Sequence, residues 1–232
     1  MRGFASETSS WIDVDEIGVF RFEPSGPVRV LAESADVESS IDDVWVRSVL
    51  PLVLQARGTE VLHASALRRA DSSIVALAGK MLAGKSTLAA AASQQKGLGV
   101  AADDALPFVI DEAHVMAAPI PFRLRLREPS LQVLGAVRSR DRVPPPDPAP
   151  LRAIVLLDPQ SSGEPDYALL DPTYAVGALM PHAYCFSLES SRERLFDTYV
   201  RLCSRVPVWQ FTYPQHINRL DEVVDALVTL PE

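Results

Sequence analysis

The sequence lacks any long apolar run. None of its apolar stretches approaches the roughly 18 consecutive residues that cross a bilayer, and the first residues, MRGFASETSSWIDVDE, lack the apolar segment of a secretory signal. No membrane partner is therefore expected, and we predict a cytoplasmic protein.

Cysteine and basic residues are also scarce. Cys185 and Cys203 are the only cysteines, too few for a disulfide framework, and are predicted to be thiols in the core. Lys and Arg number 22 against 30 Asp and Glu, which gives a formal net charge of −8. Because nucleic acids are bound by clustered Lys and Arg, this balance argues against nucleic acid as the main partner. The oligomeric state stays open.

What is present resembles an ordinary globular protein. The 232 residues are 47% apolar and 22% charged, which predicts a single domain over residues 1–232 with N-terminal strands and a helix in 1–57. Strands are expected at 17–22, 27–31, 60–67, 72–79, 98–110, 114–120, 151–157 and 208–213. Helices are expected at 36–55, 85–95, 191–206 and 217–230. This interleaving predicts an α/β fold, a mixed sheet flanked by helices.

Two further segments have distinct compositions. Five prolines fall within residues 142–150, RVPPPDPAP, which predicts an exposed loop. Residues 122–128, FRLRLRE, alternate Arg with apolar side chains, which predicts a strand with one charged face.

The most specific motif is a phosphate loop. Residues 79–86, GKMLAGKS, match G-x-x-x-x-G-K-[ST] between an apolar strand and a helix, the context that the motif requires. Such a loop turns successive N–H groups toward a phosphate, and the helix adds the positive end of its dipole. Lys85 would reach the β- and γ-phosphates, and the Ser86 hydroxyl would ligate Mg²⁺. The predicted cofactor-binding residues are Gly79, Lys80, Met81, Leu82, Ala83, Gly84, Lys85, Ser86 and Thr87.

Two adjacent acids follow the next predicted strand. If residues 98–102 run parallel to the strand before the loop, Asp103 and Asp104 emerge at the edge of the sheet where the phosphates lie. One carboxylate would then bind Mg²⁺ and the other would accept a proton from an attacking hydroxyl. We assign Asp103 to the metal and Asp104 to the base. The reverse assignment, and an acidic turn without chemistry, stay open.

These residues resemble a known family. LHASAL, VALAGKMLAGKSTLAAA and GVAADDALPF, within residues 61–110, are similar to the kinase domain of HPr kinase/phosphorylase. They are more similar to the shorter HPr-kinase-like proteins associated with lasso-peptide and other peptide-modification gene clusters. The resemblance implies the phosphoenolpyruvate-carboxykinase-like form of the phosphate-loop sheet, with ATP and Mg²⁺ as cofactors. It also implies that Asp104 acts as base and that His63 is a catalytic residue that approaches the acidic pair and tunes it, with a buried histidine without chemistry as the alternative.

The sequence departs from the family pattern at three points. Met81 and Leu82 replace the Ser-Gly usual inside the loop, so a bulkier and stiffer loop is expected. The extra N-terminal domain and the Arg-Gly-Arg-Asn segment of the HPr-specific enzymes are missing, so HPr is not expected to be the substrate. The arginine that steadies the transferred phosphoryl group has no motif match. Arg123 and Arg125 are candidates, although a solvated face is the alternative.

The expected function is phosphorylation of a serine hydroxyl on a peptide or small protein by ATP and Mg²⁺. A precursor peptide of a ribosomally made natural product, modified near its C-terminus, is the acceptor that the shorter relatives suggest. Two alternatives remain: a nucleotide hydrolase with water as acceptor, and a nucleotide-sensing module that binds a peptide without chemistry. Use of GTP and a reverse reaction with phosphate are not decided by the sequence.

Overall fold

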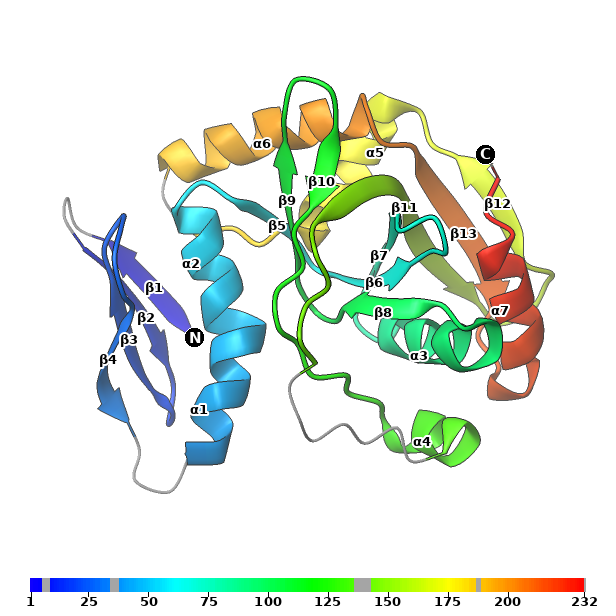
Figure 1. Cartoon of the computed structure of the whole chain (residues 1–232), viewed down its shortest axis with the longest axis horizontal. Helices are drawn as coiled ribbons and strands as arrows, with labels where there is room; N and C mark the ends of the chain where they lie inside the picture. Colours follow the sequence, from blue (N-terminus) through cyan, green and yellow to red (C-terminus); the bar gives the residue numbers. More distant parts are fainter. Residues whose placement is uncertain (6–8, 34–37, 136–142, 187–188, 232) are drawn as a thin grey trace.

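The computed structural model describes residues 1–5, 9–33, 38–135, 143–186 and 189–231. A small sheet and an adjoining helix lie on one side of the molecule, and a larger sheet with helices around it forms the rest (Figure 1). Within these ranges no helix is both long and apolar enough to span a membrane.

The N-terminal strands form an antiparallel sheet in the order β1-β2-β3-β4. Its strands are β1 (Arg2–Ala5), β2 (Ser10–Val14), β3 (Gly18–Phe22) and β4 (Arg29–Glu33). It packs on one helical segment made of α1 (Glu38–Val44), the π-helical η1 (Trp45–Val49) and α2 (Leu50–Ala56). Their shared core joins Ile12, Phe20 and Phe22 of the sheet to Val49 and Val53 of the helix. The prediction of strands followed by a helix is confirmed, but β1 and β2 were not predicted.

The larger sheet has nine strands and is mixed. They are β5 (Glu60–Leu62), β6 (Ala64–Arg68), β7 (Ile74–Gly79), β8 (Gly99–Ala102), β9 (Leu106–Ile110), β10 (Val115–Ala117), β11 (Ala149–Gln160), β12 (Asp166–Leu169) and β13 (Val208–Pro214). β11 runs parallel to β7 and β13, whereas the other pairs are antiparallel. The sheet curls where the chain passes His63, because β5 pairs with β9 while β6 pairs with β7 and β8.

Helices cover both faces of this sheet (Figure 1). They are α3 (Lys85–Lys96), α4 (Glu128–Leu134), α5 (Pro172–Leu179), α6 (Glu189–Cys203) and α7 (Leu220–Val228), with 3₁₀ turns η2 (Met180–His182) and η3 (Ile217–Arg219). α3 and α7 share one core cluster, and α5 and α6 share the other. β7, sequence IVALAG, is therefore buried on both faces, as its unbroken apolar run requires. The predicted α/β fold, a mixed sheet flanked by helices, is confirmed.

The strand directions bring the loop and the acids together. β7 and β8 each pair antiparallel with β6, so they point the same way although they are not neighbours. The phosphate loop follows β7 and the acidic pair follows β8. Both therefore lie at the same edge of the sheet.

Two sequence predictions about irregular segments need correction. Residues 122–127 form no strand: Phe122 makes a single bridge to Val143, and α4 begins at Glu128. Phe122 and Leu124 are nevertheless buried against Ala90, so the alternation reflects burial without strand pairing. In the proline-rich segment, 144–148 is irregular as predicted, but β11 already starts at Ala149 and pairs with β10 through Pro150. Proline is tolerated there because it lies near the start of a strand. Residue 142 lies outside the described residues.

Other boundaries also differ. The predicted strand 98–110 is split into β8 and β9 by the turn that contains the acidic pair. α4, β12 and α5 were not predicted. Cys203 is a buried free thiol, as expected, while Cys185 is only half-buried.

Candidate active site

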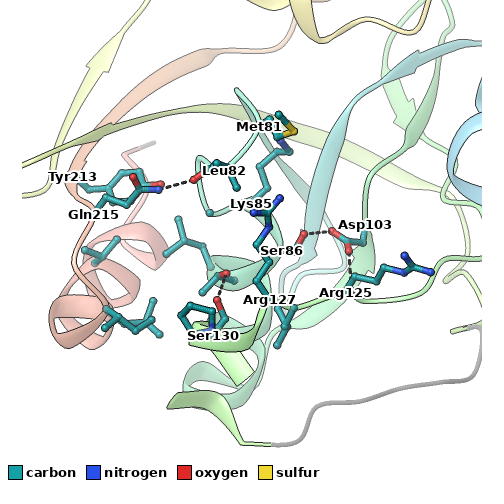
Figure 2. A pocket seen from close by; sticks show the side chains of 18 of the residues that line it. Met81, Leu82, Lys85, Ser86, Asp103, Arg125, Arg127, Ser130, Tyr213 and Gln215 are labelled. Atoms are coloured by element: carbon teal, nitrogen blue, oxygen red, sulfur yellow. Dashed lines mark hydrogen bonds between the residues drawn. The ribbon is translucent and has the colours of Figure 1, made fainter. Parts of the chain in front are cut away.

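A pocket of about 690 Å³ lies over the loop between β7 and α3. This volume is typical of small-molecule sites. Figure 2 shows the loop, the Ser86–Asp103 contact, the α4 segment, and Tyr213 and Gln215 at the end of β13 arranged around it. Of the predicted cofactor-binding residues, those lining the pocket are Met81, Leu82, Gly84, Lys85, Ser86 and Thr87. Gly79, Lys80 and Ala83 belong to the same loop but are not part of this lining.

Glycine is required at both ends of the loop. Gly79 has φ +154°, and a Cβ there would lie 3.1 Å from the Leu157 Cβ. Gly84, which caps α3, has φ +86°, and its Cβ would lie 3.3 Å from the Tyr213 hydroxyl. A side chain at either position would combine a strained backbone with a close contact.

Met81 and Leu82, between these glycines, project outward. Met81 is 80% and Leu82 56% exposed, so the added bulk faces away from the loop interior. Leu82 has φ 71°, a left-handed conformation that costs a residue other than glycine about 1–2 kcal/mol. Tyr213, near the end of β13, and Gln215, just after it, hold the loop: Gln215 Nε2 donates to the Leu82 carbonyl at 2.5 Å, and Tyr213 Oη donates to the Ala83 carbonyl. The loop is thus fixed from outside.

Lys85 points back into the loop. Its Nζ donates to the carbonyl oxygens of Gly79 at 2.8 Å and Lys80 at 3.2 Å, and the residue is only 8% exposed. Burial lowers the pKa of Lys85, while the carboxylates of Asp104 and Asp103 oppose that shift. The loop carbonyls of Gly79, Lys80, Leu82 and Ala83 all accept hydrogen bonds. The Ala83 N–H donates to the Lys80 carbonyl at 3.1 Å, so the other N–H groups of the loop and the Lys85 ammonium are the donors available to an anionic ligand.

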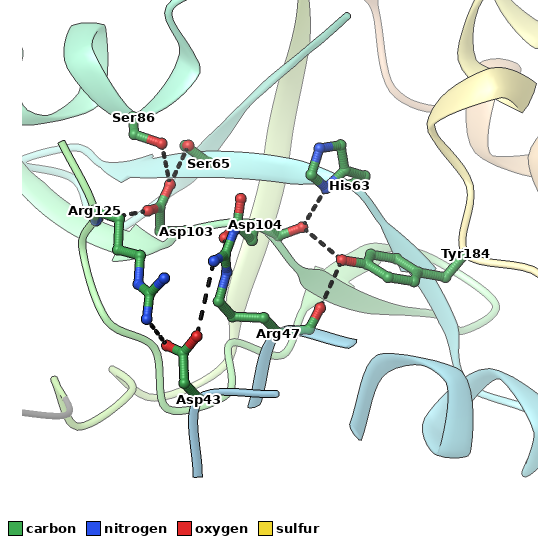
Figure 3. A network of polar contacts seen from close by, with 9 residues as sticks. All are labelled: Asp43, Arg47, His63, Ser65, Ser86, Asp103, Asp104, Arg125 and Tyr184. Carbon is green, nitrogen blue, oxygen red and sulfur yellow. Dashed lines mark hydrogen bonds and ion pairs between the residues drawn. The ribbon is translucent and has the colours of Figure 1, made fainter. Parts of the chain in front are cut away.

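Asp103 is buried beside the start of α3 (Figure 3). Its Oδ1 accepts from the hydroxyls of Ser65 and Ser86, each at 2.7 Å, and its Oδ2 accepts from the Arg125 N–H at 3.3 Å. Burial raises the pKa of Asp103, and the neighbouring Asp104 adds to the rise. A cation placed here would relieve both effects.

These groups fit Mg²⁺. Mg²⁺ takes oxygen ligands and is usually held by one or two protein groups together with phosphate oxygens and waters. Ser86 and Asp103 offer a hydroxyl and a carboxylate in contact with each other at the phosphate loop. No cluster of three or more His, Cys, Asp or Glu side chains suited to a metal occurs in the described parts of the chain. Phosphate oxygens would therefore have to complete the coordination.

Asp104 faces the same pocket but has different partners. Its Oδ2 accepts from Arg47 Nε at 2.6 Å, and Arg47 comes from the π-helical segment η1. Its carbonyl oxygen accepts from His63 Nδ1 at 2.8 Å and lies 3.2 Å from the Tyr184 hydroxyl. His63 is therefore placed next to the acidic pair, but through the main chain. Burial lowers the pKa of His63, and Lys85 adds to this effect.

The two arginines proposed to steady the phosphoryl group differ in their position relative to the pocket. Arg125 lines the pocket and pairs with Asp43 at 2.6 Å, while Arg123 pairs with Asp42 at 3.3 Å and is not part of the lining. Sequence reasoning missed Arg47, which no motif marks. It also missed Ser65, although Ser65 lies two residues after His63 in the LHASAL segment.

The far end of the pocket is apolar. It lies between α3, α4, η3 and α7, and its apolar lining includes Leu88, Leu126, Ile217, Leu220 and Val223. Thr87 and Ser130 join α3 to α4 there, their hydroxyls 2.8 Å apart. A ligand with a charged end at the loop and an apolar ring system at this end would match the pocket.

Buried His182 should make the fold sensitive to acid. Burial lowers its pKa from 6.5 to about 4, and Lys85, His63 and Lys80 add to the shift. In the unfolded chain His182 binds a proton as the pH falls below 6.5, whereas in the folded protein it stays neutral until about pH 4. Stability should therefore fall across that window by up to about 3 kcal/mol.

Urea unfolding at pH 7 and pH 5 should show a smaller loss for His182→Gln than for the wild type. An unchanged loss would contradict this, and His114→Gln, at an exposed position, is the control.

Comparisons with known proteins give likenesses among solved structures but none among sequences. No protein-family model matches the chain, and no curated protein sequence matches it. Among solved structures, the chain is similar to the Hpr(Ser) kinase/phosphatase from Coxiella burnetii, with 12% identity and a TM-score of 0.41. The match covers 72% of this chain and 87% of that one.

Proposed function

We propose that this protein is a phosphotransferase that moves the γ-phosphoryl group of ATP to a hydroxyl acceptor. One observation carries the proposal: a second carboxylate, Asp104, faces the pocket that already holds the phosphate loop, Lys85 and the Ser86–Asp103 pair. A nucleotide-binding loop needs only the latter groups. A base next to the phosphates is what transfer to a hydroxyl adds.

Each residue has a defined part in the transfer. The loop N–H groups and Lys85 would bind the β- and γ-phosphates, and the ammonium would neutralise charge that develops on the transferred group. Ser86 and Asp103 would hold Mg²⁺, which supplies further neutralisation of the phosphate oxygens. Asp104 would accept the hydroxyl proton as the acceptor oxygen bonds to the γ-phosphorus. The bond from that phosphorus to the β,γ-bridging oxygen breaks, and ADP leaves.

Serine on a peptide or small protein is the acceptor that we propose. The similarity of residues 61–110 to HPr-kinase-like sequences supports this choice, and a precursor peptide modified near its C-terminus remains the most specific candidate. The Coxiella protein is named for HPr(Ser). HPr itself is included as an acceptor only for comparison. A cytoplasmic location stays a prediction.

The proposal is tested by measuring whether the rate of ADP release depends on the presence of an acceptor peptide. The protein is incubated with ATP, Mg²⁺ and a set of serine-containing peptides, some ending in serine, with alanine-substituted peptides as matched controls. We expect ADP release to rise at least tenfold with an acceptor peptide and not with its alanine counterpart. Rapid ADP release that no peptide alters would favour the hydrolase, and nucleotide bound but left intact would favour the binding module.

Loss of the Ser86 hydroxyl should weaken the response to Mg²⁺. Ser86→Ala removes the hydroxyl that is proposed as an oxygen ligand of Mg²⁺. The same hydroxyl is one of the two that donate to Asp103 Oδ1. We expect turnover to fall by about 10- to 100-fold, with a higher Mg²⁺ concentration needed for half-maximal rate. Titrating Mg²⁺ at saturating ATP measures both. Ser93→Ala, farther along α3, is the control, and an unaltered Mg²⁺ requirement in Ser86→Ala would remove Ser86 from the metal site.

A further inference from the structure

We propose that Arg47 is a positioning residue for Asp104, fixing the base from the N-terminal helix. The inference rests on the proposed function and deepens it, because it identifies what sets the direction of the proton-accepting oxygen. Figure 3 shows Arg47 reaching Asp104 from the helical segment α1-η1-α2 that packs on the N-terminal sheet.

The side chain of Asp104 has one engaged oxygen and one open oxygen. Arg47 Nε donates to Oδ2 at 2.6 Å, a short charge-assisted contact. Among the described residues, no hydrogen bond or ion pair reaches Oδ1. The carboxylate lines the pocket, so the open oxygen is the one that an acceptor hydroxyl can meet. With Oδ2 held, the carboxylate cannot rotate without breaking the ion pair.

The main chain of Asp104 is fixed by other groups. Its φ of 67° is left-handed, a conformation that costs a non-glycine residue about 1–3 kcal/mol and persists where its surroundings enforce it. Its carbonyl accepts from His63 Nδ1, and the Tyr184 hydroxyl lies 3.2 Å from the same oxygen. That hydroxyl is also 3.0 Å from the Arg47 carbonyl. Burial raises the pKa of Tyr184, so the phenol keeps its proton and bridges helix and turn.

Arg47 is itself held in place. Asp43, one turn earlier, lies 3.8 Å from Arg47 Nη1 and 2.6 Å from Arg125 Nη2. The segment that carries Arg47 is π-helical, a feature frequent at functional sites. Val49 and Val53 of the same helix pack into the N-terminal sheet. The sheet thus supports the helix, and the helix presents the guanidinium to the base.

Two other roles for Arg47 predict different results. An ion pair that only adds stability contributes little when partly exposed, and Arg47 is 37% exposed. A ligand of the nucleotide phosphates would contribute to binding, so its loss would raise the KM for ATP, and would also weaken ADP affinity if it contacted the α- or β-phosphate. A positioning residue changes the rate of transfer and leaves nucleotide affinity nearly unchanged.

The test compares Arg47→Gln and Arg47→Lys with Arg57→Gln. Arg57 follows the same helix, and its guanidinium donates to the carbonyls of Glu23 and Gly26, away from the pocket. We expect Arg47→Gln to lower kcat by about 10- to 100-fold, with KM for ATP and Kd for ADP within about twofold of the wild type. Arg47→Lys should recover part of the loss. Guanidinium ion at a non-denaturing concentration should partly restore Arg47→Gln, and Arg57→Gln should keep its kcat.

Several outcomes would overturn the inference. The first is an unchanged kcat in Arg47→Gln. The second is a rise of tenfold or more in the KM for ATP or in the Kd for ADP. The third is a loss of rate that guanidinium does not restore, together with a wild-type rate in Arg47→Lys. If the Gln variant fails to fold, the Lys variant carries the comparison. If the wild type transfers phosphate to no acceptor, the proposed function fails separately. Crystal structures of wild type and Arg47→Gln then decide about Arg47 by whether the Asp104 carboxylate turns away from the pocket.

Discussion

Replacing Lys85 by alanine should reduce phosphoryl transfer by about 10³-fold or more. The Lys85 ammonium is buried inside the loop, on the carbonyls of Gly79 and Lys80, and in the proposed function it binds the β- and γ-phosphates. Single-turnover formation of ADP in the presence of an acceptor peptide measures the effect. Lys96→Ala at the other end of α3, where Lys96 pairs with Asp225, is the matched control.

Thermal unfolding of Lys85→Ala shows whether a loss of turnover comes from the missing ammonium or from an unfolded protein. Burial lowers the pKa of Lys85, so its charged form is disfavoured in the folded protein; alanine removes this cost together with the two hydrogen bonds to the loop carbonyls, and we expect only a small change in the midpoint of thermal unfolding. A folded Lys85→Ala protein with more than a tenth of wild-type turnover would contradict the role given to Lys85.

Asp104→Asn should lower turnover by about 10²- to 10⁴-fold, the range that general base catalysis contributes. Asparagine tolerates the left-handed backbone at this position and its amide oxygen can still accept from Arg47, so the turn should persist. Affinity for Mg·ADP should stay within about threefold, because Asp104 is assigned to the acceptor and Asp103 to the metal. Rapid-quench kinetics and calorimetric titration with ADP measure the two quantities.

The outcome for Asp104→Asn also tests the assignment of the two acids. A large loss of Mg·ADP affinity with Asp104→Asn, and not with Asp103→Asn, would reverse their roles. Unchanged Mg·ADP affinity, with no turnover in either the wild type or the variant, would favour a binding module. Asp111→Asn, a substitution of the same kind in an exposed turn, is the control.

The sequence predicts the parts of the site that depend on local pattern. The loop lies between a strand and a helix that were predicted almost to the residue, because an unbroken apolar run and an alanine-rich segment ending at Gly97 have clear signatures. The acidic pair lies at the same edge of the sheet as the loop, because β8 points in the same direction as β7. That shared direction could be expected because a single helix connects the two strands.

The partners of Asp104 could not be predicted in this way. Arg47 is 57 residues away in sequence and Tyr184 is 80, and neither lies in a motif. Such contacts arise from tertiary packing of the N-terminal helix and the segment after η2. The error at residues 122–127 has a related cause: burial alternates there, but the Arg125 N–H donates to Asp103 where a strand would need a pairing partner.

The most direct measurement is the intact mass of a serine-containing acceptor peptide after incubation with this protein, ATP and Mg²⁺. We predict a gain of one phosphate on the peptide, absent with Lys85→Ala and nearly absent with Asp104→Asn. ATP converted to ADP with no mass gain on any acceptor, or bound and left intact, would contradict it.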